Sequence, residues 1–139
     1  MEEPVNEGAC FCEAVRFRVI GAPRSLAFCH CQSCRRASGA PFVAWGSFPS
    51  AGFEITHGAP ASFASSPGVT RGFCARCGTQ LTYAHSERAD EIDVTLVSLR
   101  NAAAYPPQRH VYTEHRLPWV EIGDGLPQYA RFMANSDTE

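Results

Sequence analysis

The sequence lacks the charge and the apolar runs that would indicate nucleic-acid binding or a membrane span. Its 12 Lys and Arg residues face 14 Asp and Glu residues, so the formal charge is −2. Proteins that bind nucleic acids usually carry a basic surplus, because their affinity comes mainly from neutralising phosphates. No apolar run approaches the roughly 20 residues needed to cross a bilayer. We therefore expect neither a nucleic-acid partner nor a membrane.

The sequence also shows no secretory signal. Residues 1–7 are acidic and contain neither a basic n-region nor an apolar h-region. We therefore expect a cytoplasmic protein, in which thiols stay reduced and clustered cysteines more often bind metal than form disulfides. The cysteine count of seven is odd, so a complete disulfide framework would leave one thiol over. Metal binding is the better interpretation.

Signals for long helices are scarce, and no repeat or low-complexity stretch occurs. The length of 139 residues fits one domain, and the 11 Gly and 10 Pro residues divide it into short elements. Alternating apolar and polar residues predict strands at 15–19 and 92–96. Weaker strands are expected at 42–48, 53–56, 61–64, 79–83, 110–113 and 119–122. Short helical turns are expected after Cys34, at 101–104 and at 126–133, and a frayed tail at 134–139. This pattern predicts an all-β domain over residues 1–139.

All seven cysteines fall into three short clusters. These are Cys10-Phe11-Cys12, Cys29-His30-Cys31-Gln32-Ser33-Cys34 and Cys74-Ala75-Arg76-Cys77. Zinc prefers thiolate sulfur in a tetrahedral shell, and a C-x-C or C-x-x-C turn places two sulfurs on one ion. Gly78 directly follows Cys77 and suits such a turn, because it tolerates a positive φ and exposes its N–H to a sulfur. Three clusters that use every cysteine make a specific signal for zinc.

Seven ligands divide naturally into a set of four and a set of three. A site with four protein ligands is closed and structural, whereas a site with three keeps a position open for water or substrate. The middle triple is local enough to hold one ion by itself; it consists of Cys29, Cys31 and Cys34. The closed set would then consist of Cys10, Cys12, Cys74 and Cys77. Spacing alone leaves a four-cysteine site that uses Cys29 and Cys31 open as an alternative.

Longer segments around these cysteines form a recognisable set. They are Gly8-Ala9-Cys10-Phe11-Cys12, Cys29-His30-Cys31-Gln32-Ser33-Cys34-Arg35 with Gly39-Ala40-Pro41-Phe42, Phe73-Cys74-Ala75-Arg76-Cys77-Gly78-Thr79-Gln80-Leu81, and His110-Val111-Tyr112 with Leu117-Pro118-Trp119-Val120-Glu121-Ile122 and Asp124-Gly125-Leu126-Pro127. Together they resemble the glutathione-dependent formaldehyde-activating enzyme family, which also includes centromere protein V. The resemblance spans about 8–129, the expected domain core.

The resemblance implies a β-tent fold, built from antiparallel sheets around a zinc. It also implies two zinc ions per chain, the first C-x-C and the last C-x-x-C holding a structural ion and the middle triple a catalytic-type ion. Glu13 departs from the pattern, because the family commonly has glycine after the second cysteine. No ligand is missing.

An open zinc with three thiolates favours thiol chemistry. The three thiolates outweigh the charge of the ion, so it lowers the pKa of bound water less than a zinc with three histidines does. Its open position suits a fourth sulfur, and an incoming thiol would bind as thiolate. With glutathione, attack on formaldehyde gives S-hydroxymethylglutathione, and the reverse step cleaves a carbon–sulfur bond. The family name implies this reaction, so we expect a carbon–sulfur lyase whose partner is a small thiol or thiol adduct.

Substrate contacts and histidine roles are less sharply indicated. Arg35 and Arg36 directly follow Cys34 and are candidates for binding the carboxylates of glutathione, because guanidinium binds carboxylate bidentately. His30 is either a donor near the site or a solvent-facing turn residue. The other four histidines are expected to be surface residues or bystanders: His57, His85, His110 and His115. The aromatic residues expected mainly in the core are Phe42, Trp45, Phe48, Phe53, Phe63, Phe73 and Trp119.

Three other functions stay open at this point. A non-catalytic zinc module for protein interaction would need no exchangeable position on the second zinc. A thiol redox protein would cycle Cys31 and Cys34 between thiols and a disulfide. No helix N-terminus that would lower a thiol pKa is evident beside this pair. A nucleic-acid zinc ribbon fits the net charge of −2 least well.

Overall fold

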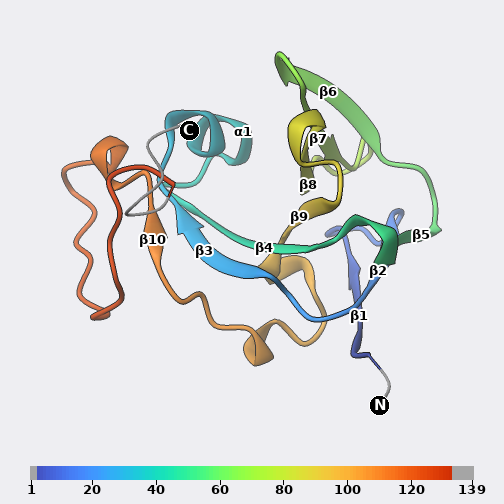
Figure 1. Ribbon diagram of the computed structural model, residues 1–139. Coiled ribbons are helices and arrows are strands. Elements are labelled where there is room, and N and C mark those ends of the chain that lie inside the picture. The colour runs from blue at the N-terminus through green and yellow to red at the C-terminus, as the bar shows by residue number, and fades with distance from the viewer. Residues whose placement is uncertain (1–2, 133–139) are drawn as a thin grey trace.

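The computed structural model describes residues 3–132, which form a small and a large β-sheet and one α-helix (Figure 1). The small sheet has the order β1-β2-β5 and is antiparallel. Its strands are β1 (Val5–Ala9), β2 (Arg16–Ile20) and β5 (Phe53–His57). In β2, Phe17 and Val19 are buried while Arg16 is exposed. This alternation gives the strand one apolar face for the core.

The large sheet has seven strands in the order β10-β3-β4-β9-β8-β7-β6. All neighbours pair antiparallel except β10, which runs parallel to β3. The strands are β3 (Ser25–Cys29), β4 (Val43–Pro49), β6 (Ala61–Ser66), β7 (Val69–Phe73), β8 (Gln80–His85), β9 (Glu91–Thr95) and β10 (His110–Val111). The prediction of a mainly antiparallel all-β fold is confirmed.

Helix α1 (Gln32–Ser38) lies at the end of β3, across from β6 and β7 (Figure 1). It begins directly after Cys31, whose Sγ accepts a hydrogen bond from the Cys34 N–H at 3.3 Å, and ends at Gly39 with φ +69°. The sequence had predicted a helical turn after Cys34. The helix instead begins before Cys34. The 3₁₀ turns are η1 (Ser50–Gly52), η2 (Ser86–Arg88), η3 (Leu96–Ser98), η4 (Ala102–Ala104) and η5 (Thr113–His115). Across residues 3–132, each helix is too short or too polar to cross a membrane.

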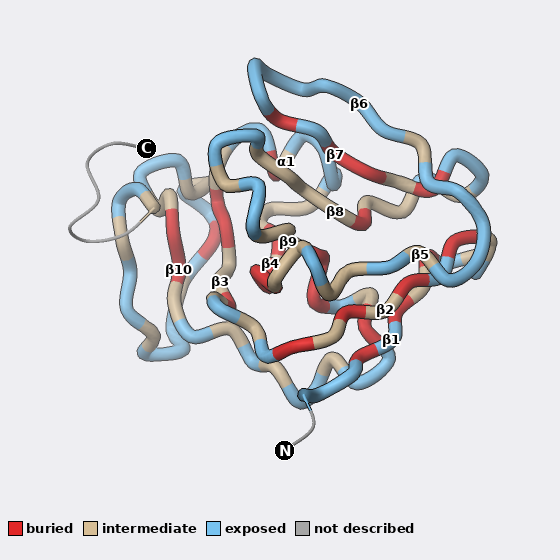
Figure 2. The backbone as a smooth tube through the Cα atoms, turned by 45° about the vertical axis from the view of Figure 1, so that its right-hand side comes forward, coloured by how far each residue is buried: buried red, intermediate tan, exposed pale blue. Residues whose placement is uncertain are grey.

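The two faces of the large sheet have different neighbours. Leu26, Phe48 and Val94 are buried in a core cluster that also contains Phe17 of the small sheet. Figure 2 shows the buried stretches of β2, β3 and β4 that belong to this interior. The opposite face of the same strands lines a cavity, because successive side chains of a strand point to opposite faces of the sheet. One sheet thus separates the hydrophobic core from the cavity.

Four further expectations for the fold are wrong. Residues 119–122 form no strand, and Trp119 is 70% exposed rather than buried. Phe63 on β6 is 63% exposed, and β6 is an edge strand whose residues 62–66 are all exposed. The described part of the helix expected at 126–133, residues 126–132, contains no helix. Its backbone instead pairs with β10, as the bond from the Tyr129 N–H to the His110 carbonyl at 2.9 Å shows. Residues 133–139, including the expected tail, lie outside the described part of the chain.

Candidate functional site

Four cysteine sulfurs meet where two turns come together. Cys10 and Cys12 lie between β1 and β2, and Cys74 and Cys77 lie between β7 and β8. The four Sγ atoms all lie within 4.8 Å of one another. The Sγ atom of Cys12 is 3.8 Å from that of Cys10 and 3.8 Å from that of Cys74. This four-sulfur set could hold one metal ion.

Hydrogen-bond donors surround the four-sulfur set. The Val15 N–H donates to Cys10 Sγ at 3.3 Å, and the Cys77 N–H donates to Cys74 Sγ at 3.4 Å. The Thr79 hydroxyl lies 3.2 Å from Cys77 Sγ, and this hydrogen bond lowers the pKa of Cys77 to about 5. Such donors stabilise the thiolate, which is the form that binds metals.

Both turns of the four-sulfur set use left-handed backbone. Gly78 has φ +82°, as expected, although its N–H donates to the Cys74 carbonyl at 2.8 Å rather than to a sulfur. Glu13 has φ +63°, a conformation that non-glycine residues adopt at a cost. Its N–H closes the turn by donating to the Cys10 carbonyl at 3.1 Å. The turn conformation that glycine would favour is therefore kept despite the glutamate.

The other three cysteines form a second cluster at the junction of β3 and α1. Cys29 ends β3, Cys31 caps α1, and Cys34 lies in the first turn of the helix. Their Sγ atoms also lie within 4.8 Å of one another. Hydrogen bonds from Cys29 and then from Cys34 lower the pKa of Cys31 to about 3. Hydrogen bonds with Cys31 and Cys34 raise the pKa of Cys29. This three-sulfur set could hold a second metal ion.

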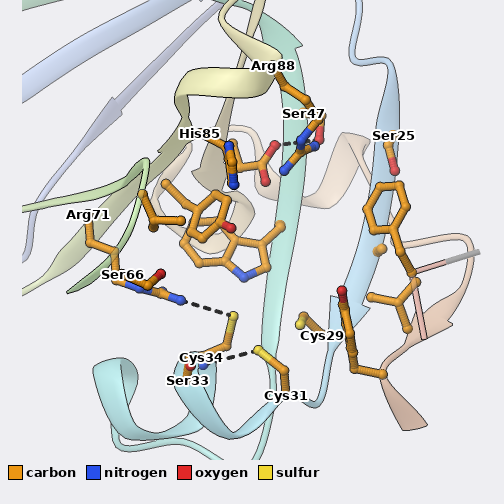
Figure 3. A pocket seen from close by; sticks show the side chains of 18 of the residues that line it. Ser25, Cys29, Cys31, Ser33, Cys34, Ser47, Ser66, Arg71, His85 and Arg88 are labelled. Atoms are coloured by element: carbon orange, nitrogen blue, oxygen red, sulfur yellow. Dashed lines mark hydrogen bonds between the residues drawn. The ribbon is translucent and has the colours of Figure 1, made fainter. Parts of the chain in front are cut away.

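The three-sulfur set lies at one end of a cavity of about 650 Å³ (Figure 3). In the view of Figure 3, the three sulfurs lie at the bottom and Ser47 and Arg88 at the top. None of the cysteines of the four-sulfur set lines this cavity. The two sets therefore differ in access to the cavity as well as in the number of sulfurs.

Aromatic and charged side chains form the wall between the two ends. The rings of Trp45 and Tyr83 lie 6.1 Å apart, and the Arg71 guanidinium lies 5.0 Å from the centroid of the Tyr83 ring. Nearer the far end, the Ser47 hydroxyl donates to Asp93 Oδ1 at 2.5 Å. Burial raises the pKa of Asp93 to about 6. Arg88 lines the same end. The cavity thus offers sulfur at one end and groups of opposite charge at the other.

The arginines of the cavity are not the ones that the sequence suggested. Arg35 and Arg36 lie on α1, and neither lines the cavity. Arg71 on β7 and Arg88 in η2 do line it, as does His85, which was expected to be a bystander. Neither arginine has a local signal that distinguishes it from the other arginines, because its position depends on strand pairing across the large sheet. Sequence reasoning therefore missed all three residues.

Two histidines are buried instead of lying at the surface. His30 has an exposed fraction of 0%, so the solvent-facing interpretation is wrong. Its Nε2 atom lies 2.9 Å from Nδ1 of His110, which is 3% exposed and was also expected at the surface. His110 Nε2 lies 2.8 Å from Asp124 Oδ2. By contrast, His57 is exposed, and His115 lies on η5 with its side chain half exposed.

Comparison with known proteins places this arrangement in a family. Residues 5–115 match the family model described as glutathione-dependent formaldehyde-activating enzyme. The chain belongs to this family. A Halomonas elongata protein named as a glutathione-dependent formaldehyde-activating enzyme is 32% identical over 127 residues, which cover 84% of this chain and 80% of that protein. A Schizosaccharomyces pombe protein named as an uncharacterized lyase is 35% identical over 85 residues, 60% of each chain.

A solved structure supports the fold of this family member. The crystal structure of a Rhodobacter sphaeroides protein superposes with a TM-score of 0.58 and 18% sequence identity. The match covers 88% of this chain and 98% of that one. At this identity the likeness shows the fold alone. The resemblance found from the cysteine segments is thus confirmed for the family.

Proposed function

We propose that this family member is a zinc-dependent carbon–sulfur lyase acting on a thiol–aldehyde adduct of the S-(hydroxymethyl)glutathione type. The observation that carries the proposal is that Cys29, Cys31 and Cys34 present three clustered sulfurs at the end of a cavity. The four-sulfur set lies outside that cavity. Family membership supports glutathione and formaldehyde as reactants, and the relatives named as enzyme and lyase support the reaction class.

The donor chemistry of both sets fits zinc. Zinc binds thiolate sulfur at about 2.3 Å in tetrahedral geometry, so two sulfurs on one ion lie about 3.8 Å apart. The Sγ atom of Cys12 lies at that distance from both Cys10 and Cys74. With four ligands this set would be a closed structural site, and the three-sulfur set would leave one position for a ligand from the cavity. Two zinc ions per chain are therefore part of the proposal.

The chain's own residues would bind and orient the thiol. Zinc at the three-sulfur set would supply a soft Lewis acid that keeps a bound sulfur ionised. The rings of Trp45 and Tyr83 would exclude water from the cavity wall. Arg88 and Asp93 at the far end would pair with the carboxylate and ammonium groups of glutathione. Neither Arg35 nor Arg36 lines the cavity, so the structure gives no support for their contacts with the carboxylates of glutathione. Those contacts stay a prediction.

The first test is the zinc content of protein purified without chelator, with and without reduced glutathione. The proposal expects two zinc per chain, one of which exchanges or changes its environment when glutathione is added. Exchange of ¹³C-formaldehyde between free and adduct forms is then followed by NMR, at a mildly acidic pH where the uncatalysed reaction is slow. Zinc-loaded protein should accelerate the exchange, and Cys34→Ser should not. An exchange rate equal to the protein-free rate would reject this substrate.

A redox function is a second candidate, and one observation favours it. Cys31 caps the N-terminus of α1 and has a pKa lowered to about 3 by its thiol neighbours, a feature that the sequence did not reveal. Reactive thiols share these features. A redox role predicts a reversible Cys31–Cys34 disulfide in protein holding one zinc, whereas the lyase predicts that bound metal protects all three thiols. Mass spectrometry after mild oxidation distinguishes the two.

A further inference from the structure

Arg71 is the most deeply buried arginine of the described residues, with 7% of its surface exposed. It lies on β7, opposite Tyr83 of β8, and lines the cavity close to the three-sulfur set. Figure 3 shows its guanidinium group pointing toward Cys34. A buried cation needs partners for its donors, and an unpaired donor costs free energy. The partners of this arginine therefore reveal what its site can bind.

Contacts within the protein satisfy only some of the hydrogen-bond donors of the Arg71 guanidinium. Its Nε donates to Ser65 Oγ at 3.2 Å, and its Nη2 donates to Cys34 Sγ at 3.8 Å. Nη1 is buried and has no hydrogen-bond partner. Within residues 3–132, no carboxylate forms an ion pair with Arg71. The protein thus holds Nε and Nη2, whereas Nη1 has no partner, in a side chain that lines the cavity.

We propose that Arg71 is a catalytic residue that binds the oxygen of the thiol–aldehyde adduct through Nη1. This inference rests on the proposed function and adds the residue that recognises the hydroxymethyl group. Because Nη2 already contacts Cys34 Sγ, a substrate sulfur that joins the three-sulfur set lies close to the same guanidinium. The adduct oxygen is one carbon away from that sulfur. A forked cation is suited to contact both atoms.

The movement of negative charge during the reaction favours a cationic hydrogen-bond donor beside the adduct oxygen and the sulfur. The adduct hydroxyl loses its proton to water, and the oxygen becomes an alkoxide. The carbon–sulfur bond then breaks, its electron pair stays on sulfur as thiolate, and the carbon–oxygen bond becomes the aldehyde carbonyl. Negative charge thus passes from oxygen to sulfur. A preorganised buried donor at the place where charge develops stabilises the transition state more than the ground state.

A binding experiment on zinc-loaded protein tests Arg71 without any turnover. Two small thiols serve as probes: mercaptoacetate, which carries an anionic oxygen near its sulfur, and ethanethiol, which does not. Their dissociation constants are measured by calorimetry for the wild type and for Arg71→Gln. We expect the preference for mercaptoacetate to fall at least tenfold in the variant, because a charge-assisted hydrogen bond is lost. The affinity for ethanethiol should change less than threefold, and the zinc content should stay at the wild-type value.

The matched control removes the same charge elsewhere. Arg18 on β2 is partly exposed, pairs with Glu54 and does not line the cavity, so Arg18→Gln should leave the preference unchanged. An unchanged preference in Arg71→Gln overturns the proposal, and so does an equal loss of affinity for both thiols, which would mean that Arg71 supports only Cys34. If Arg71→Gln does not fold, Arg71→Lys carries the test. Its compact ammonium cannot contact sulfur and oxygen together, so a drop of about threefold is expected and an unchanged preference rejects the proposal.

The outcomes also separate this inference from the proposed function. A lost preference in a protein that shows no adduct exchange would keep Arg71 as an oxyanion-binding residue and reject the lyase. An unchanged preference in a protein that accelerates exchange would keep the lyase and reject the role of Arg71.

Discussion

The buried imidazoles of His30 and His110 are hydrogen-bonded to each other, with 2.9 Å between Nε2 and Nδ1. His110 Nε2 also lies 2.8 Å from Asp124 Oδ2. A carboxylate accepts, so His110 donates through Nε2, and its Nδ1 accepts from the Nε2–H of His30. Burial lowers the pKa of His30 to about 4, which keeps this ring neutral at physiological pH. The three side chains join the loop of the three-sulfur set to the C-terminal segment.

Replacing His110 with alanine should therefore destabilise the protein. The change leaves His30 without its partner and opens space beside Phe28, whose ring stacks on His110 with 4.9 Å between centroids. We expect the free energy of unfolding to fall by about 2–4 kcal/mol, measured by urea denaturation of zinc-loaded protein. His57→Ala is the control, because His57 is exposed and the change should stay within about 0.5 kcal/mol. Equal midpoints for the two variants would show that the buried chain contributes little.

Asp93 should give stability a specific pH dependence. Burial raises its pKa to about 6 from an ordinary value near 4. Between about pH 4 and pH 6 the folded protein therefore holds a proton that the unfolded chain has released, so the free energy of unfolding falls as pH rises through this window. The Asp93→Asn variant has no carboxyl group to titrate at this position, so this fall in the free energy of unfolding is absent. Its amide oxygen can still accept the hydrogen bond from Ser47. The melting temperature of the variant relative to the wild type should rise from pH 4.5 to pH 7 and then level off. A difference that does not change with pH would contradict the raised pKa.

Local patterning predicted the strands whose buried positions are apolar. The regular alternation in β2 and β9 led to their prediction, whereas β1 buries Asn6 and β7 buries Arg71 at positions where an apolar residue would be expected. The strand predicted around Trp119 failed for the opposite reason. Its apolar residues are not part of any strand, and Trp119 is exposed. Polar residues in buried strands are thus where local reasoning fails, and one of them lines the cavity.

Sequence reasoning could predict the grouping of the cysteines, but it could not predict the other residues that line the cavity. Short C-x-C and C-x-x-C turns bring their own sulfurs together, so spacing suggested the two sets that the structure brings together. Arg71 reaches Cys34 across 37 positions of sequence through the pairing of β7 with β8. Arg35 and Arg36 follow Cys34 in sequence, yet they lie on a helix that does not present them to the cavity. Sequence proximity to a ligand is therefore a poor guide to cavity lining here.

Glycine at position 13 should stabilise the turn of the four-sulfur set. Glu13 adopts φ +63°, where a side chain costs about 1–2 kcal/mol and glycine does not. Alanine is the matched control, because both variants lose the ion pairs of Glu13 with Arg16 and Arg100. We expect Glu13→Gly to exceed Glu13→Ala by about 1 kcal/mol in the free energy of unfolding, measured by urea denaturation with zinc in excess. Identical stabilities would mean that the turn relaxes in the alanine variant.

Loss of a ligand from each set should separate structural from exchangeable metal. Cys77 belongs to the four-sulfur set, which ties the turn after β1 to the turn after β7. Structural zinc contributes on the order of 10 kcal/mol to folding, so Cys77→Ser should lose one zinc together with its cooperative unfolding transition. Cys34→Ser should also lose one zinc but keep the wild-type circular dichroism and a cooperative transition, because the large sheet does not depend on a closed site there. Zinc content and thermal unfolding are measured on both variants. If Cys34→Ser unfolds as well, both sets are structural and the cavity would hold no exchangeable metal; if Cys77→Ser stays folded, the sheets hold themselves together without the four-sulfur set.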